Sequence, residues 1–228
     1  MPEKRARSPQ RAKTQVVAAD ASELRDRILR ASIELIEDEG LAKLSMREVA
    51  RRAGVTHQAP YHHFADREQI LGEIAEQGFH LLSERLSAAA LPRDVQRDNC
   101  VTLLRALGEA YVQFAVSHPA HFRIMFRPEL VDMDNCPGAK QAGHACFSNV
   151  RDVVHAAVQA GLPAVPNEDA LVALMWSLVH GLACLLLDGP LAMKMPDTAR
   201  DVQIRGVMQG FAALLQASLG QKAPRRSR

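Results

Sequence analysis

Apolar residues recur every three or four positions along most of this chain, which is the spacing of one face of an α-helix. Runs of strictly alternating apolar and polar residues, which would indicate strands, do not occur convincingly anywhere. The pattern predicts an all-α protein of about nine helices. The clearest amphipathic segments cover residues 22–39, 46–53, 66–90, 95–117, 139–160 and 198–219.

The segment from Ala170 to Leu187 differs because it is apolar on nearly every side. Its length alone would allow it to span a membrane. However, Ser177, His180 and Gly181 interrupt it, and neither flank carries the Lys/Arg cluster that orients a membrane span. We therefore expect a soluble helix without a membrane partner. One of its sides would meet its own core, and the other would meet a second copy of the chain.

Residues 44–69 carry the signals of two short helices joined by a tight turn. Ser45 is a suitable N-cap and Glu48 follows three residues later, which is the spacing of a capping box. Gly54 stands where a helix ends in a left-handed residue, and Val55 is the apolar residue just beyond it. Together these signals predict a helix-turn-helix, whose second helix reads the major groove of DNA.

The second of these helices contains few residues that a protein core would require. It consists mainly of small or hydrogen-bonding side chains: Thr56, His57, Gln58, Ala59, Tyr61 and His62. A glutamine can bond to adenine through two hydrogen bonds, and threonine and alanine methyl groups can touch thymine. The alternative is a solvent-exposed helical hairpin that binds no nucleic acid.

These residues also carry a resemblance to a family. Residues 45–70 resemble the N-terminal domain of the TetR-type (TetR/AcrR) bacterial transcriptional regulators, in the Ser-Met-Arg-Glu-Val-Ala opening, the Ala-Gly-Val-Thr turn and the Tyr-His-His-Phe segment. The resemblance implies base or nearby contacts by Thr56, His57, Gln58 and His62, and phosphate contacts by Arg47, Tyr61, His63 and Arg67. Pro60 departs from many family members, and proline is comfortable only in a helix's first turn. The recognition helix is therefore expected to begin near His57 or Gln58.

A second motif lies in the apolar segment, where Trp176, His180 and Gly181 are similar to the signature of a C-terminal subgroup called the WHG domain. The resemblance implies a homodimer and a pocket for a small-molecule effector. The candidate pocket residues are Tyr111, Phe114, Phe122, Met125, Phe126, Trp176 and His180. The candidate dimer-interface residues are Leu178, Gly181, Leu182, Leu185, Val207, Phe211 and Leu214. From the residues alone, His180 is expected to be a packed histidine with an internal hydrogen bond.

Composition narrows the possibilities further. The net charge is only +2, so any binding to nucleic acid must depend on where the charges lie. The four cysteines form no C-x-x-C pair, and His118 and His121 have no acidic or cysteine ligand beside them. No metal site, cofactor or catalytic residue is predicted, because the sequence lacks the nucleotide-binding, nucleophile-elbow and zinc-protease motifs. The absence of an apolar signal segment and the scattered cysteines favour the cytoplasm.

The chain is expected to divide into four parts. Residues 1–20 form a disordered basic arm, 21–66 the DNA-binding domain, 67–219 a helical ligand-binding and dimerisation domain, and 220–228 a disordered basic tail. The resemblance implies a transcriptional regulator, most simply a repressor, that binds a near-palindromic operator in double-stranded DNA and is released by an effector. Two other readings stay open: a nucleoid or division-type DNA-binding protein without an effector, and a helical enzyme whose hairpin is incidental.

Overall fold

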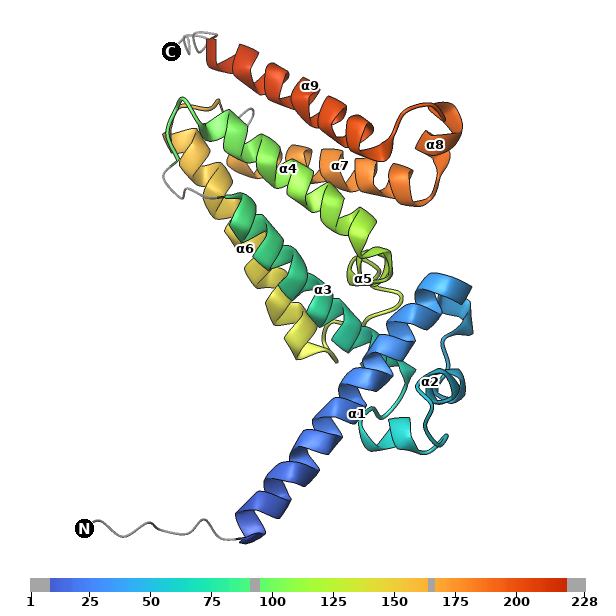
Figure 1. Cartoon of the computed structure of the whole chain (residues 1–228). Coiled ribbons are helices and arrows are strands. Elements are labelled where there is room, and N and C mark those ends of the chain that lie inside the picture. The colour runs from blue at the N-terminus through green and yellow to red at the C-terminus, as the bar shows by residue number, and fades with distance from the viewer. Residues whose placement is uncertain (1–8, 91–94, 164–166, 221–228) are drawn as a thin grey trace, which may run out of the picture. The chain divides into compact units, whose positions relative to one another are not determined.

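The computed structural model describes residues 9–90, 95–163 and 167–220, and these residues form helices joined by turns and loops, with no strand among them (Figure 1). The α-helices are α1 (Pro9–Glu39), α2 (Met46–Arg52), α3 (Arg67–Ala89), α4 (Cys100–Ser117), α5 (Pro119–Met125), α6 (Pro137–Gln159), α7 (Glu168–Leu187), α8 (Pro190–Lys194) and α9 (Arg200–Gly220). Two short 3-10 helices, η1 (Leu41–Lys43) and η2 (Ala59–His62), complete the described part of the chain. The all-α prediction is confirmed.

The chain divides into two compact units, one ending at Ile74 and the other beginning at Ala75. The first unit therefore extends beyond residue 66, where the sequence had suggested a boundary. The reason is visible at Glu73 in α3, whose two carboxylate oxygens accept hydrogen bonds from Arg25 of α1 at 2.9 and 2.6 Å. This paired interaction ties the beginning of α3 to the first unit.

The core of the first unit forms where α1, α2 and the start of α3 turn their apolar faces inward. Ile28, Leu35 and Val49 are fully buried there, and Phe64 is 1% exposed. The guanidinium carbon of Arg25 lies 5.1 Å from the centre of the Phe64 ring, a cation–π contact that holds the chain after η2 against α1. Phe64 is thus a packing residue.

One predicted boundary needs correction, and one helix was not predicted. Residues 9–20, which were expected to belong to a disordered arm, continue α1 as helix from Pro9, while residues 1–8 and 221–228 lie outside the described part of the chain. Helix α8 was not predicted. It follows Gly189, whose φ of 86° is left-handed, and it begins at Pro190, whose fixed φ suits the first turn of a helix.

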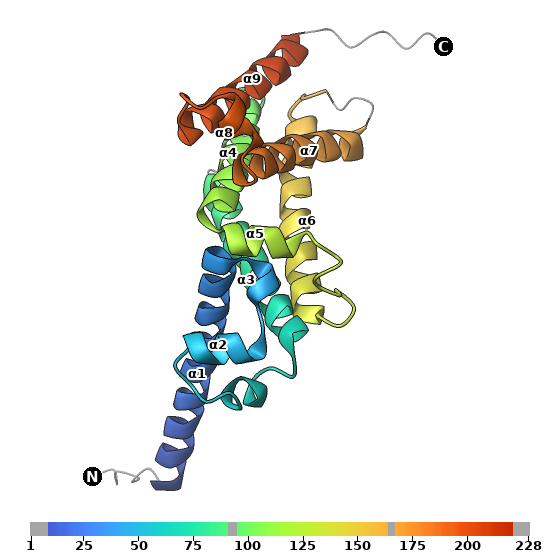
Figure 2. The same ribbon diagram turned by 90° about the vertical axis from the view of Figure 1, so that its right-hand side faces the viewer.

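In the second unit α4 is the central helix and contacts α5, α6, α7 and α9 (Figure 1). Its buried face includes Leu104, Tyr111 and Phe114. Helix α6 lies beside the C-terminal part of α3, where Asn149 donates a hydrogen bond to Ser83 at 3.1 Å. Helix α7 crosses next to α4 and α6 (Figure 2). Its N-cap is Asn167, whose side chain accepts a hydrogen bond from the Ala170 N–H at 2.9 Å.

Helix α7 is the one described helix that is long and apolar enough to cross a membrane, which is weak evidence because core helices pass the same test. Its Met175, Val179 and Leu182 face the interior of the second unit. The opposite side leaves Leu174 57% exposed and Leu185 46% exposed. The helix therefore packs on one side against other helices of its own unit, and its opposite side is an apolar face that the described residues do not cover.

Candidate nucleic-acid interface and apolar cavity

The turn between α2 and η2 has the geometry that its residues predict. The Ser45 hydroxyl accepts a hydrogen bond from the Glu48 N–H at 3.3 Å, so Ser45 caps α2. The Glu48 carboxylate bonds to Arg51 instead of returning to Ser45, so only half of the capping box forms. Gly54 has a φ of 66°, and the Val55 N–H donates to the Ala50 carbonyl at 3.0 Å, which closes the end of α2.

The expected second helix is shorter and tighter than an α-helix. Residues 59–62 form the 3-10 helix η2, and the Tyr61 N–H donates to the Gln58 carbonyl three residues back. Pro60 explains the difference, because it has no N–H to donate to the carbonyl of Thr56. That carbonyl accepts the Ala59 N–H at 3.0 Å instead. The expectation that the helix begins only near Gln58 agrees with this geometry, since Gln58 occupies its N-cap position.

The side chains around η2 divide into an outward set and an inward set. Pro60 and Phe64 form the inward set, and their burial in the core of the first unit holds the segment in place. The outward set consists of exposed residues that can form hydrogen bonds or stack: Thr56, His57, Gln58, Tyr61 and His62. The Gln58 and His57 side chains already lie side by side, with their Nε2 atoms 3.1 Å apart. The segment therefore presents a continuous polar edge that the core does not require.

The three arginines of α2 differ in how their charge is used. Arg51 pairs with Glu48, and Arg52 pairs with Asp38 and Glu39 of α1. Arg47 is exposed and makes no ion pair with any residue in the described part of the chain. Arg47 is consequently the arginine of α2 whose charge is most available to an anion such as a phosphate.

Arg67 is placed differently from the other candidate phosphate contacts. It is partly buried and donates a hydrogen bond from Nη2 to the Leu41 carbonyl at 3.2 Å, while its buried Nε has no partner among the described residues. At least part of this guanidinium therefore serves to hold η1 against the start of α3. His63 is also half-buried, whereas Tyr61 is 53% exposed.

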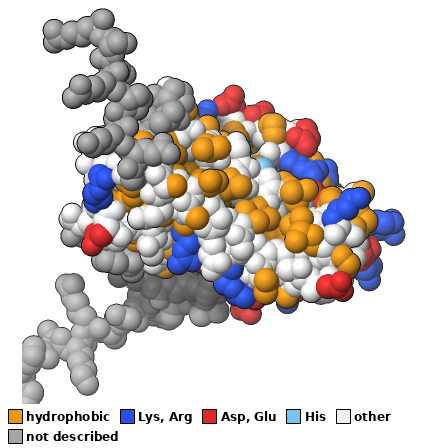
Figure 3. Space-filling model, turned by 90° about the horizontal axis from the view of Figure 1, so that it is seen from above, with side chains coloured by type: hydrophobic (Ala, Val, Ile, Leu, Met, Phe, Trp, Pro, Cys, Tyr) orange, Lys and Arg blue, Asp and Glu red, His pale blue; other side chains and the backbone are white. Residues whose placement is uncertain are grey.

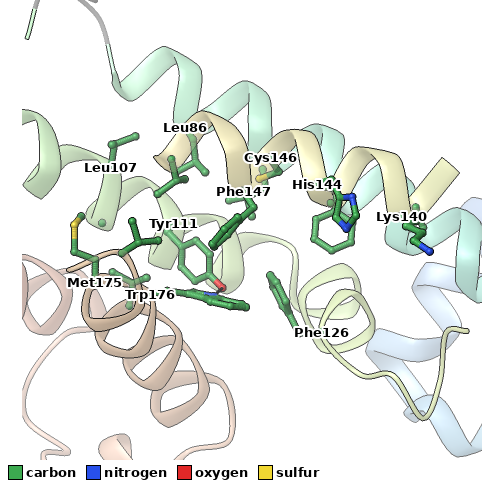
Figure 4. A pocket seen from close by; sticks show the side chains of 18 of the residues that line it. Leu86, Leu107, Tyr111, Phe126, Lys140, His144, Cys146, Phe147, Met175 and Trp176 are labelled. Atoms are coloured by element: carbon green, nitrogen blue, oxygen red, sulfur yellow. Dashed lines mark hydrogen bonds between the residues drawn. The ribbon is translucent and has the colours of Figure 1, made fainter. Parts of the chain in front are cut away.

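The second unit contains a partly open cavity of about 440 Å³ between α3, α4, α6 and α7 (Figure 4). This volume lies within the usual range for small-molecule sites, which is roughly 300–1,000 Å³. Almost all of the wall is apolar. The lining residues are Phe79, Leu82, Leu86, Leu107, Gly108, Tyr111, Phe126, Met133, Ala139, Lys140, Gly143, His144, Cys146, Phe147, Val150, Val172, Met175, Trp176 and Val179.

Three of the seven predicted pocket residues line the cavity, namely Tyr111, Phe126 and Trp176. The other four do not line it. Phe114, Phe122 and Met125 are almost completely buried among the helices, where apolar side chains from α4 and α5 form the core. His180 stands one layer behind the wall and stacks near Phe122, with ring centres 5.1 Å apart.

A hydrogen-bonded group accounts for two residues of the Trp-His-Gly motif. The Tyr111 hydroxyl lies 2.9 Å from Nδ1 of His180 and accepts a hydrogen bond from Nε1 of Trp176 at 3.3 Å. Burial raises the pKa of Tyr111 and lowers that of His180, so both groups stay neutral near pH 7. A neutral histidine can accept a hydrogen bond from the tyrosine hydroxyl at Nδ1, so the Tyr111 hydroxyl donates to His180 and accepts from Trp176. The expected internal hydrogen bond of His180 is confirmed.

Helix α6 supplies residues of the cavity that sequence reasoning missed. Lys140, His144 and Phe147 lie on one face of α6, at helical spacing, and all three are exposed to some degree. Their spacing was visible in the sequence, but nothing distinguished that face from an ordinary solvated one. Among the described residues no group of three or more His, Cys, Asp or Glu side chains is arranged to hold a metal ion.

The uncovered face of the second unit comprises the outer sides of α7 and α9. Seen from above, apolar side chains gather in the middle of this surface and most charged ones lie toward its rim (Figure 3). Of the predicted interface residues, Gly181, Leu185 and Leu214 are exposed, and Leu178 and Val207 are half-buried. Leu182 and Phe211 are 6% and 8% exposed, because they point into their own unit. These two are core residues and not part of the exposed face.

Two family models match the chain. Residues 28–74 match the model of bacterial regulatory proteins of the tetR family, and residues 104–208 match that of the tetracyclin repressor-like C-terminal domain. The first match covers α2, η2 and the start of α3, and the second covers most of α4 to α9. The two matches fall on either side of the boundary between the units.

Individual proteins show the same likeness. The chain is 35% identical over 65 residues to the HTH-type transcriptional regulator SrpR of Pseudomonas putida and 39% identical over 57 residues to AcrR of Shigella flexneri. These matches cover 28% and 25% of this chain, and only 30% and 26% of the length of those relatives.

Two solved structures are similar over most of the chain. A Rhodococcus sp. RHA1 protein, described as of unknown function, is 28% identical, with a TM-score of 0.67, and the match covers 84% of this chain and 95% of that one. The TetR family transcriptional regulator PfmR of Thermus thermophilus shares the fold at 20% identity, with a TM-score of 0.64 and coverage of 86% and 100%.

Proposed function

The chain belongs to the TetR family of bacterial regulatory proteins, and from this premise we propose that it is a sequence-specific, DNA-binding transcriptional regulator. We propose further that it acts in the cytoplasm as a homodimer on a near-palindromic operator. Its proposed output is repression, which a small-molecule effector relieves. The observation that carries the proposal is the exposed polar edge around η2, held above a buried anchor in a capped turn.

The chemistry of that edge supports reading of base pairs. Gln58 offers an amide that can bond to adenine through two hydrogen bonds, and Thr56 offers a methyl group beside a hydroxyl. Arg47 and Tyr61 flank this edge and are exposed, which suits them to contact phosphates. His57 and His62 supply further hydrogen-bonding groups, while Arg67 and His63 are only partly accessible. We therefore assign phosphate contacts first to Arg47 and Tyr61.

The uncovered face of α7 and α9 supports the homodimer. Leu174, Leu185 and Leu214 expose between 46% and 72% of their surface, which costs free energy unless a partner covers them. Nothing within 4 Å would meet a Cβ placed at Gly181, Gly206 or Gly210, so the backbone there is open to close approach by another helix. The same pair of helices in a second copy would complete a four-helix contact, and a two-fold axis would present two reading edges to one duplex.

The cavity supports the proposal that the protein binds a small-molecule effector. It is of ligand size, it is largely preformed, and its wall is apolar with few polar groups. A ligand held there can alter DNA binding only if it has different affinities for the DNA-binding and the released states of the dimer. This requirement makes the effector testable separately from the DNA site.

The proposal is tested by selecting binding sequences from random double-stranded DNA with the purified full-length protein. The expected result is a near-palindromic sequence, bound by a dimer with an affinity that falls steeply as salt is raised. Equal retention of all sequences, or a monomer at micromolar concentration, would overturn it. DNA binding that no small molecule weakens would instead leave the DNA-binding regulator standing and remove the effector.

A further inference from the structure

The inner end of the cavity contains no hydrogen-bonding group that is available to a ligand. Leu86, Leu107 and Met175 form that end (Figure 4). The Tyr111 hydroxyl also belongs to the lining, but it is engaged by Trp176 on one side and by His180 on the other. A polar ligand atom placed there would lose its water and gain no partner, which is costly. The inner part of any occupant must therefore be apolar.

The other end of the cavity has a different character. Lys140 and His144 lie there, away from the leucine end (Figure 4). Within the described part of the chain, Lys140 is the one charged side chain that lines the cavity, and no Asp or Glu lines it. Lys140 is half-exposed, so its ammonium group stands where the cavity meets solvent. A charged ligand group at this end should therefore be negative.

A ligand carboxylate could readily replace the present partner of Lys140. Its ammonium group donates a hydrogen bond to the Asp134 carboxylate at 2.7 Å, and the Asp134 side chain is 84% exposed. Asp134 belongs to the loop between α5 and α6 and does not itself line the cavity. A carboxylate on a bound ligand can take the place of this exposed partner, because it offers the same acceptor from inside the cavity.

The aromatic residues of the wall raise the opposite possibility, a cationic ligand held by ring faces. The ring arrangement does not favour it. The Trp176 ring contacts the rings of Phe126 and Phe147, with centres 6.0 and 5.9 Å apart. These rings pack on one another, and a cation beside them would have no carboxylate partner among the lining residues and would be repelled by Lys140.

We propose that the cavity takes an amphipathic monoanion, with one carboxylate on an elongated apolar body. The carboxylate pairs with Lys140 at the mouth, and the apolar end lies among Leu86, Leu107 and Met175. This inference rests on the proposed function, since it names the chemical class of the effector. It also predicts that Asp134 competes with the ligand for Lys140, so that Asp134 limits the affinity.

The single tryptophan of the chain, Trp176, lines the cavity, so its fluorescence reports occupancy directly. The experiment titrates the full-length protein with decanoate, decanol and decyltrimethylammonium, each below the concentration at which it aggregates. Decanoate should bind tightest and decyltrimethylammonium weakest. Lys140→Met should weaken decanoate about three- to tenfold and leave decanol unchanged, which is the range for loss of one charge-assisted contact near solvent. Lys194→Met, on α8 away from the cavity, is the matched control and should change neither.

Asp134→Asn provides the opposite test, because it removes the competing charge from an exposed loop position and keeps the side chain's shape. It should tighten decanoate a few-fold, with decanol again unaffected. Tighter binding of the ammonium compound than of decanoate, or the same loss of decanoate and decanol in Lys140→Met, would overturn the proposal. A parallel titration of the protein–operator complex separates the two claims. Release by decyltrimethylammonium alone would refute the ligand class only, whereas decanoate that binds without releasing DNA would refute the effector role only.

Discussion

The candidate functional residues are arranged in opposite ways in the two units of this protein. In the first unit five of the candidate residues lie close together in the sequence around η2 and are exposed: Thr56, His57, Gln58, Tyr61 and His62. The buried Pro60 and Phe64 support them. In the second unit the cavity is assembled from five segments of the chain, and its residues point inward. A contiguous, exposed site leaves a local pattern in the sequence. A dispersed, enclosed site resembles core, because the same side chains would be chosen for packing alone.

The largest effect is expected from a substitution in the exposed face of α7 and α9, through which two copies of the chain are proposed to pair. Gly181→Arg adds a long charged side chain at a helical position where an added Cβ would meet no other part of the described chain within 4 Å, so the subunit itself should fold unchanged. The variant should be monomeric and should bind the operator about 10²–10⁴-fold more weakly, because the two reading edges are no longer linked. Analytical ultracentrifugation and fluorescence anisotropy measure the two quantities.

Ala145→Arg is the matched control, since Ala145 is exposed on α6 and lies outside the predicted interface. It should remain dimeric with unchanged operator affinity. If Gly181→Arg also remains dimeric, the exposed face of α7 is not the contact between copies. That face then no longer supports the proposal of a homodimer.

A second prediction concerns acid, to which the second unit should be sensitive through His121 of α5. Burial, with a smaller contribution from nearby His118, lowers the pKa of His121 to about 4. His121 therefore takes up a proton near pH 6.5 in the unfolded chain but only near pH 4 in the folded unit. Stability should be full above pH 6.5 and fall by up to about 3 kcal/mol between the two values, then stay level below pH 4 as far as His121 is concerned.

Urea denaturation followed by Trp176 fluorescence measures this loss, because Trp176 lies in the second unit. His121→Leu removes the titrating group and the Nδ1 atom that has no hydrogen-bond partner among the described residues. Its stability should be flatter between pH 6.5 and 4 than that of the parent. His144→Gln alters an exposed histidine and should leave the parent's pH dependence in place. Superimposable curves for the parent and His121→Leu would contradict the assignment.

The third prediction concerns the exposed polar edge around η2 in the first unit, which is called the reading edge because it is proposed to contact DNA bases. Gln58→Ala removes an exposed amide and should cost about 1–3 kcal/mol on the operator but almost nothing on random DNA. Arg47→Ala should weaken both DNAs alike and reduce the salt dependence of binding, because a phosphate contact carries no sequence information. Anisotropy titrations at several salt concentrations distinguish these outcomes. An equal loss on both DNAs in Gln58→Ala would show that Gln58 does not read bases.

The difference between the units also explains what the sequence could predict. The helical pattern, the cap at Ser45 and the left-handed Gly54 are local features, and each has the predicted geometry. The family assignment from the two motifs is confirmed by both family models. Local rules were also enough to place the start of the recognition segment, although they did not predict that Pro60 would reduce it to the 3-10 helix η2.

The cavity was predicted less well, for a physical reason. Phe114 and Trp176 are both aromatic residues at helical positions, yet one is fully buried in the core and the other lines the cavity. The distinction depends on which neighbouring helix leaves space, and no single segment contains that information. Lys140 was missed in the same way, because a lysine on an amphipathic helix is usually only solvated. Leu182 and Phe211 were assigned to the interface because the resemblance implies a dimer contact through their two helices, and the side of each helix that faces its own unit could not be told from the sequence.

The smallest effect is expected from one kind of bond that occurs in both units, the side-chain cap of a helix. Ser45→Ala and Asn167→Ala each remove a cap and should each cost about 1 kcal/mol. Their consequences should differ, because α2 has only 7 residues and supports the reading edge directly, whereas α7 has 20 and is held by packing. Hydrogen exchange should show α2 opening more often in Ser45→Ala, and operator affinity should fall a few-fold. Asn167→Ala should loosen the first turn of α7 and leave operator affinity unchanged. An equal loss of affinity in both variants would mean that the reading edge depends on the stability of the whole chain and not on its own unit.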